Sequence, residues 1–281
     1  MKKSVLILLL SFGILGVSFC QTANYEIYAL RFADVGQAFP LSALAMDAPA
    51  GENVNAVFSI WLIKGNGKNI LVDAGFLNDI PEAKDFSVVR YIRPDSAIIR
   101  FGLQPADISD IILTHPHWDH IDGVSLFPNA QVWMQKDDYN YFVGSAWQKG
   151  GNKGGFNERD VRMMLDLNLG GRLHLVDGDS KELLPGITVY TGSRHTYNSE
   201  YVLVKTGNNK VVLASDNAYT YYNIDHLKSA PPNSTFDTAG YVKQLQRMKT
   251  LVSDPKYIIP GHDAAVFTRF PTVKEGVVRI R

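Results

Sequence analysis

Three histidines and two aspartates lie within ten consecutive positions of this chain. Residues 114–123 read Thr-His-Pro-His-Trp-Asp-His-Ile-Asp-Gly, so that His115, His117, Asp119 and His120 follow the spacing His-x-His-x-Asp-His. Imidazole nitrogen and carboxylate oxygen are ligands that zinc and other borderline divalent metals prefer. A short histidine-rich tract is typical of metal sites, whereas a polar loop after a buried strand has little need of three imidazoles. The segment therefore predicts a metal site.

Three further candidate ligands each follow an apolar run that reads as a buried strand. His195 comes after residues 187–191, Asp216 after 210–214, and His262 after 257–259. A single histidine in such a place more often makes a structural hydrogen bond than a metal bond. Three such residues downstream of the first motif, each at the exit of a strand, are better explained as further ligands, because ligand sites in layered α/β folds lie at strand ends.

The amino-terminal residues predict a secretory signal peptide. Lys2 and Lys3 precede an apolar run over residues 5–17, which is short for a membrane span. We therefore expect a signal peptide over residues 1–20, one folded domain over 21–281 without a membrane span, and export to the periplasm or beyond the cell.

The only cysteine, Cys20, lies at the end of this leader. Cleavage after Cys20 would place Ser18 and Cys20 at the two small-residue positions that signal peptidase reads. Acylation of Cys20 as a lipoprotein is the weaker alternative, because the bulky Phe19 precedes it, and retention as an uncleaved anchor is weaker still. In each case the folded part lacks a thiol, so the metal ligands must be nitrogen and oxygen.

Composition narrows the class of partner. The chain has 281 residues, of which 46% are hydrophobic and 20% charged, with a formal net charge of zero. These values are typical of a globular protein and argue against electrostatic capture of nucleic acid. We therefore expect a small neutral substrate. The sequence does not indicate an oligomeric state.

The pattern along the chain predicts a layered α/β fold of one domain. Buried strands are expected at residues 25–32, 58–64, 69–72, 108–113, 130–134, 187–191, 201–205 and 210–214. A helix is expected from Asn157 as its cap to Asn168, closed by two glycines. Tyr241, Leu245 and Met248 fall on one helical face, which we interpret as core.

Two aromatic features remain open from sequence alone. Residues 139–156 interleave five aromatic side chains with five glycines, which fits either a mobile flap over a pocket or a surface loop. Trp118, inside the histidine motif, could line the pocket or pack in the core.

The ordered set of His-x-His-x-Asp-His followed by His, Asp and His resembles the metallo-β-lactamase superfamily from about residue 58 to residue 262. The resemblance implies a four-layer αβ/βα sandwich, the metallo-β-lactamase fold, and a site for two divalent metal ions, with zinc as the expected metal. It implies that His115, His117 and His195 hold one metal and that Asp119, His120 and His262 hold the other. Asp216 would bridge the two, and Asp73 would support the site from behind.

Within that superfamily the chain is similar to the N-acyl-homoserine lactonases. They carry a tyrosine three positions beyond the bridging aspartate, which here is Tyr219, with its hydroxyl facing the lactone carbonyl. A phenol is a suitable donor to an oxyanion, although Tyr219 could also be a packed aromatic residue. The resemblance implies that a hydroxide bridging the metals opens the lactone ring, with Asp119 relaying a proton.

The region of the third histidine departs from the lactonase pattern. Lactonases commonly read Gly-His-Ser/Thr-Pro-Gly there, whereas this chain reads Arg194-His195-Thr196-Tyr197-Asn198. Asn198 could supply the left-handed conformation of the last glycine, but Arg194 and Tyr197 add bulk near the expected pocket. Hydrolysis of an aryl ester, a phosphotriester or a thioester therefore stays an alternative, and an inactive metal-bound binder of small molecules is a weaker one.

Overall fold

The computed structural model describes residues 24–281. The expected signal peptide and Cys20 lie outside these residues. The strands are β1 (Glu26–Val35), β2 (Phe39–Pro40), β3 (Asn53–Val54), β4 (Val57–Gly65), β5 (Lys68–Val72), β6 (Val88–Val89), β7 (Asp110–Ile112), β8 (Gln131–Gln135), β9 (Leu173–Val176), β10 (Lys181–Leu184), β11 (Ile187–Thr191), β12 (Glu200–Thr206), β13 (Asn209–Ser215), β14 (Ile258–Pro260), β15 (Thr272–Lys274) and β16 (Val277–Arg279).

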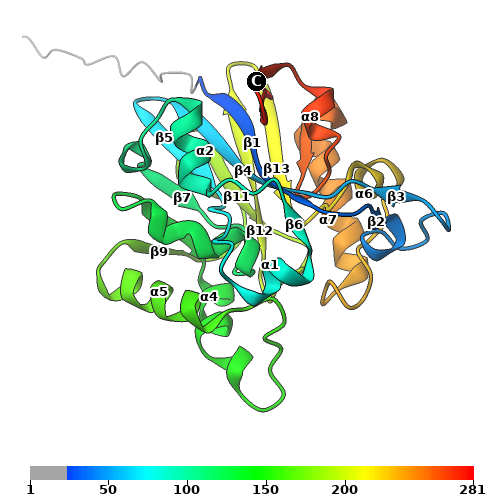
Figure 1. Cartoon of the computed structure of the whole chain (residues 1–281), viewed down its shortest axis with the longest axis horizontal. Coiled ribbons are helices and arrows are strands. Elements are labelled where there is room, and N and C mark those ends of the chain that lie inside the picture. The colour runs from blue at the N-terminus through cyan, green and yellow to red at the C-terminus, as the bar shows by residue number, and fades with distance from the viewer. Residues whose placement is uncertain (1–23) are drawn as a thin grey trace, which may run out of the picture.

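The helices flank two sheets. They are α1 (Pro81–Asp85), α2 (Pro94–Phe101), α3 (Trp118–Ile121), α4 (Lys136–Val143), α5 (Glu158–Leu169), α6 (Tyr221–His226), α7 (Thr238–Leu251) and α8 (Val266–Arg269). In Figure 1, α2, α4 and α5 lie on one side of the strands and α6, α7 and α8 on the other. None of the helices in residues 24–281 is both long and apolar enough to cross a membrane.

The larger sheet has nine strands in the order β15-β16-β1-β4-β5-β7-β8-β9, with β6 paired to β1, and the second has five in the order β10-β11-β12-β13-β14. Alternation along the central strands explains the layers, because successive side chains of a strand point to opposite faces. In β4, Phe58, Ile60 and Leu62 pack under α2, α4 and α5, while Trp61 and Ile63 face the second sheet. The predicted four-layer αβ/βα sandwich is confirmed.

The remaining layer is formed by α6 and α7. Tyr241, Leu245 and Met248 of α7 are buried in the core cluster that also contains β11 to β14, as their helical spacing predicted. Asn157 caps α5 by accepting a hydrogen bond from the Arg159 amide at 2.8 Å, which agrees with the predicted helix start.

The segment 139–156 differs from the prediction. Its first part is helical, because Tyr139 and Phe142, three positions apart in α4, both enter the core. A short 3₁₀ turn, Ser145–Trp147, follows, and only the residues after it form the glycine-rich loop. The helical spacing of apolar residues in 136–143 was not recognised from the sequence, because many glycines follow it closely.

Parallel pairing brings the strand ends of the predicted site to one edge. β5 and β7 are parallel neighbours in the larger sheet, and β13 and β14 are parallel neighbours in the smaller one. The Glu200 amide donates to the Thr114 carbonyl at 2.8 Å and ties the two sheets together at this edge. Chain segments that are far apart in sequence therefore end side by side.

Candidate metal centre

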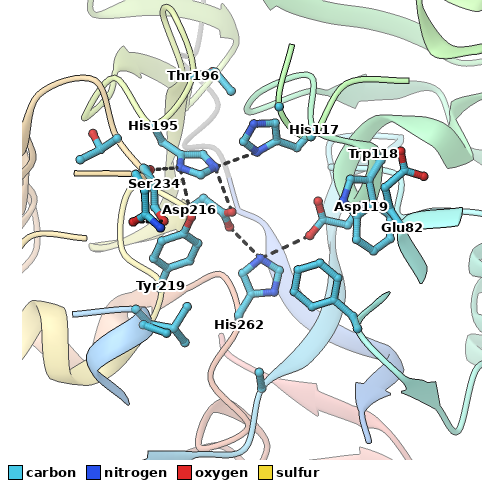
Figure 2. A pocket seen from close by; sticks show the side chains of 18 of the residues that line it. Glu82, His117, Trp118, Asp119, His195, Thr196, Asp216, Tyr219, Ser234 and His262 are labelled. Carbon is cyan, nitrogen blue, oxygen red and sulfur yellow. Dashed lines mark hydrogen bonds and ion pairs between the residues drawn. The ribbon is translucent and has the colours of Figure 1, made fainter. Parts of the chain in front are cut away.

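The seven predicted ligands meet at this common edge in two groups. The first group, in which the ligand atoms lie within 4.8 Å of one another, is His115, His117, His195 and Asp216. The second is Asp119, His120 and His262. Figure 2 shows His195 and His262 directed toward Asp216, His117 directed toward His195, and Asp119 on the opposite side of His262.

Asp216 lies between the two groups and offers one oxygen to each. Its Oδ1 is 2.9 Å from His262 Nε2 and 3.5 Å from His120 Nε2. Its Oδ2 is 3.2 Å from His195 Nε2 and 3.7 Å from His115 Nε2. A carboxylate in this position can contact two cations at once and fix their separation.

Hydrogen bonds on the far nitrogen orient the histidines of the motif. His120 Nδ1 is 2.8 Å from Asp73 Oδ2, and His115 Nδ1 is 2.9 Å from Thr114 Oγ1. Asp73 also accepts from Thr114 Oγ1 and from Ser215 Oγ, at 2.9 and 3.0 Å. Metal-binding histidines are commonly held by such partners on the second ring nitrogen.

The downstream histidines are held by backbone carbonyls. His195 Nδ1 donates to the Ser234 carbonyl at 2.8 Å, and His262 Nδ1 donates to the Val57 carbonyl at 3.0 Å. These bonds place a proton on Nδ1, so that Nε2 of each ring faces the centre and can serve as the metal ligand.

Buried polar atoms without a partner show that these residues fit a metal. Among the described residues, His115 Nε2, His120 Nε2 and Asp216 Oδ1 are inaccessible to solvent and have no hydrogen-bond partner. Burial and the neighbouring imidazoles lower the pKa of His115 well below its usual value, and they lower that of His117 to about 3. Neutral imidazoles beside buried carboxylates are the donor set that divalent cations require.

Two glycines allow the backbone to approach the ligands closely. A Cβ at Gly261 would lie 2.6 Å from Asp216 Oδ1, and a Cβ at Gly155 would lie 2.6 Å from His117 Cδ2. Gly155 also has a φ of +76°, a left-handed conformation that strains residues other than glycine. The glycine-rich loop thus packs directly on a candidate ligand.

Tyr219 lies against the first group. Its Oη is 3.2 Å from His195 Nδ1. Because the Nδ1 proton is already donated to Ser234, the phenol proton is free to be donated elsewhere. Burial and the charge of Asp216 raise the pKa of Tyr219 well above its usual value, so the group stays protonated. The side chain is both packed and positioned as a donor.

A cavity of about 730 Å³ opens onto both groups. It is lined by His117, Asp119, His195, Asp216, Tyr219 and His262, together with aromatic side chains and part of the glycine-rich loop. Trp118 both lines this cavity and packs in the core, with its ring centroid 4.7 Å from that of Phe76. The size is suitable for a small organic molecule.

Comparison with known proteins identifies the family. Residues 59–262 match the metallo-beta-lactamase superfamily, which is well over half of the chain. The chain belongs to this superfamily.

Relatives within the superfamily are lactonases. The chain is 26% identical over 179 residues to the N-acyl homoserine lactonase AttM of Rhizobium radiobacter, covering 62% of this chain and 65% of that protein. It is also 26% identical over 165 residues to an N-acyl homoserine lactonase of Bacillus cereus, covering 58% of this chain and 59% of that protein. The chain thus spans less than two thirds of the length of these relatives.

Solved structures show the same fold. An N-acyl homoserine lactone hydrolase with the product N-hexanoyl-L-homoserine at its catalytic metal centre has a TM-score of 0.71 at 19% identity, over 90% of this chain and 98% of that one. AidC, a dizinc quorum-quenching lactonase, has a TM-score of 0.61 at 18% identity, over 86% of this chain and 91% of that one.

The loop around His195, whose sequence departs from the lactonase pattern, has a different conformation from the one expected. The left-handed residue is Arg194, with φ 57°, and Asn198 is not among the residues with positive φ. The Arg194 guanidinium stacks over Tyr197 and Phe236, at 5.5 and 5.6 Å from the ring centroids. Neither Arg194 nor Tyr197 lines the cavity, so their bulk does not fill it.

Asp138 is a supporting residue that sequence reasoning missed. Its Oδ2 accepts from Thr196 Oγ1 at 2.6 Å and its Oδ1 accepts from the Asn198 amide at 3.1 Å, which anchors the loop that carries His195. Burial raises its pKa to about 6. Asp138 stands in a run of polar residues after a strand, and nothing in its sequence surroundings separates it from its neighbour Asp137.

Asp73→Asn is expected to weaken metal binding by about 10- to 100-fold, since Asp73 orients His120 through Nδ1. Asparagine tolerates the left-handed conformation of this position (φ 59°), so the backbone should be preserved. Competition with a chromogenic chelator measures the change.

Asp110→Asn is the matched control. Asp110 is also a buried aspartate, but it lies at the start of β7, the end away from the metal centre, where it pairs with Lys68 at 2.7 Å. Both variants should lose stability, but only Asp73→Asn should lose metal affinity. Equal affinities in the two variants would contradict the role of Asp73.

Proposed function

We propose that this protein is a metal-dependent hydrolase that opens the ring of a small lactone, with N-acyl-homoserine lactones as the first candidates. The observation that carries this proposal is the position of Asp216, which offers one oxygen to each of two ligand groups while Tyr219 faces the same cavity. The lactonase relatives support the substrate class. The ligand set comprises His115, His117, His195, Asp119, His120, His262 and Asp216.

Two divalent cations held there, zinc being the first candidate, would supply an activated water and a Lewis acid for the carbonyl oxygen. The protein supplies the rest. The Tyr219 hydroxyl donates to the carbonyl oxygen as charge develops on it, which stabilises the transition state more than the ground state. The hydroxyl lies 3.2 Å from His195 Nδ1, and the Ser234 carbonyl holds that imidazole in place.

Asp119 is placed to move the proton. Its Oδ2 lies 3.3 Å from His120 Nε2 and 3.5 Å from His262 Nε2, at the cavity wall. A carboxylate there can accept a proton from the attacking water and return it to the ring oxygen as the ester bond breaks. The net reaction consumes one water and yields the hydroxy acid.

A turnover panel tests the proposal. The metal-replete protein, prepared without residues 1–20, is assayed with N-acyl-homoserine lactones of several chain lengths, a simple γ-lactone, an aryl ester, a phosphotriester, a thioester and a β-lactam. We expect the highest kcat/KM for a lactone, with loss of turnover in a chelator and recovery on adding metal. Turnover of another class without lactone turnover would overturn the proposal, and metal binding without any turnover would indicate a binding protein.

A further inference from the structure

A continuous aromatic wall leads from the candidate metal centre to the far end of the cavity. The Phe58 ring centroid is 5.5 Å from that of His262 and 5.7 Å from that of Trp118. The Phe86 ring is 5.6 Å from Trp118, and Phe39 stacks on Phe86 at 6.3 Å. All five side chains line the cavity. The wall gives an acyl chain a path away from the reacting carbonyl.

Two carboxylates stand beside this wall. Glu82 and Asp85 of α1 both line the cavity, and Figure 2 shows Glu82 next to Trp118. Among the described residues, Glu82 Oε2 is inaccessible to solvent and has no hydrogen-bond partner. Neither carboxylate has an ion-pair partner in the part of the chain that the structure covers.

Three more carboxyl groups lie near Glu82, and a single arginine lies among them. Arg159 is shared by Asp122 at 2.6 Å and Asp79 at 3.0 Å. Asp160 is fully buried, and within residues 24–281 neither of its oxygens finds a partner. Burial and the charges of Asp122 and Glu82 raise the pKa of Asp160 to about 9. Asp160 is therefore protonated near neutral pH, and the unpaired carboxylates beside the cavity are those of Glu82 and Asp85.

Away from the candidate metal centre, the cavity has no basic side chain. None of its lining residues is a lysine or an arginine. The cation–π contacts of the described residues leave the rings of Phe39, Phe58, Phe86 and Trp118 free. Aromatic faces with nearby carboxylates attract cations, ammonium groups above all.

We propose that the end of the cavity formed by Phe39, Glu82, Asp85, Phe86 and Trp118 binds an ammonium group. If the protein is the hydrolase proposed above, its preferred substrate is a lactone or related ester whose acyl chain carries a positively charged nitrogen. Only this kinetic consequence rests on the proposed function. A terminal carboxylate in the same place meets Glu82 and Asp85 and is disfavoured.

The kinetic test compares homoserine lactones with the same acyl chain ending in ammonium, methyl or carboxylate. We expect kcat/KM for the ammonium substrate to exceed that for the carboxylate substrate by at least about 10-fold. The double variant Glu82→Gln/Asp85→Asn should reduce this ratio toward one. Asp166→Asn/Glu275→Gln removes the same charge from exposed positions outside the cavity and should leave the ratio unchanged.

A binding test does not depend on turnover. Choline and its neutral isostere 3,3-dimethylbutanol are titrated into the protein while tryptophan fluorescence is followed, with Trp118→Phe identifying the Trp118 signal. We expect at least about 10-fold tighter binding of choline, and loss of this preference in Glu82→Gln/Asp85→Asn.

The outcomes separate the two proposals. Equal affinities for choline and its isostere, or equal rates for the three lactones, would overturn the ammonium site. Absence of lactone turnover together with selective choline binding would overturn the lactonase function and leave the ammonium site in place.

Discussion

Asp216→Asn is expected to lower lactone hydrolysis by on the order of 10³-fold, because it removes the one carboxylate that faces both ligand groups. The Lewis-acid contribution of bound metals is worth several kcal/mol, and about 4 kcal/mol corresponds to this factor. An amide offers one neutral oxygen in place of two charged ones, at 2.9 Å from His262 and 3.2 Å from His195. We also expect the bound metal content to fall below that of the unchanged protein.

Kinetics and elemental analysis measure the two effects together. Asp166→Asn, an exposed change on α5, is the charge-matched control and should keep both rate and metal content. Circular dichroism checks that the Asp216 variant is folded. An Asp216→Asn protein with full metal content and full activity would refute a bridging role.

Tyr219→Phe is expected to lower kcat/KM for lactones by about 10²-fold, the effect of losing one donor to a developing oxyanion. Metal content should be unchanged, since the hydroxyl contacts His195 only through the nitrogen that faces away from the centre. The ring stays in place, so the cavity keeps its shape. Steady-state kinetics with metal-saturated protein isolates the contribution of the hydroxyl.

Tyr222→Phe is the control for this substitution. Tyr222 lies three positions further along, stacks on His226 and does not line the cavity. Its variant should behave as the unchanged protein does. If Tyr219→Phe matched it in kcat/KM, the phenol would have no part in the reaction.

The strand ends and the ligand groups could be predicted because the necessary information is local. Each candidate ligand follows an apolar run, and parallel pairing of β5 with β7 and of β13 with β14 carries the residues that follow them to one edge. Family resemblance then assigned the histidines to the same two groups that the structure brings together.

What sequence reasoning missed depends on contacts between distant segments. Asp138 supports the His195 loop from α4 across 58 positions, and the Ser234 carbonyl holds His195 across 39. A backbone carbonyl has no sequence signature at all. The left-handed conformation at Arg194 could not be assigned either, because its backbone is fixed by the packing of its neighbours and not by its own residue type.

The aromatic wall was also beyond prediction. Phe39, Phe58, Phe86 and Trp118 come from four separate segments, and only their packing reveals one surface. Glu82 and Asp85 read as ordinary polar residues of a short helix. Their importance follows from the cavity that they line and, for Glu82, from a buried oxygen without a hydrogen-bond partner in the described part of the chain.

The central claim is that two metal ions in this site support hydrolysis of a lactone. Metal-free protein titrated with zinc, with bound metal and lactone turnover measured at each step, tests it most directly. We expect two equivalents of zinc to bind per chain, with turnover rising as the second is bound. Saturation at one equivalent with full turnover, or turnover in metal-free protein, would contradict it.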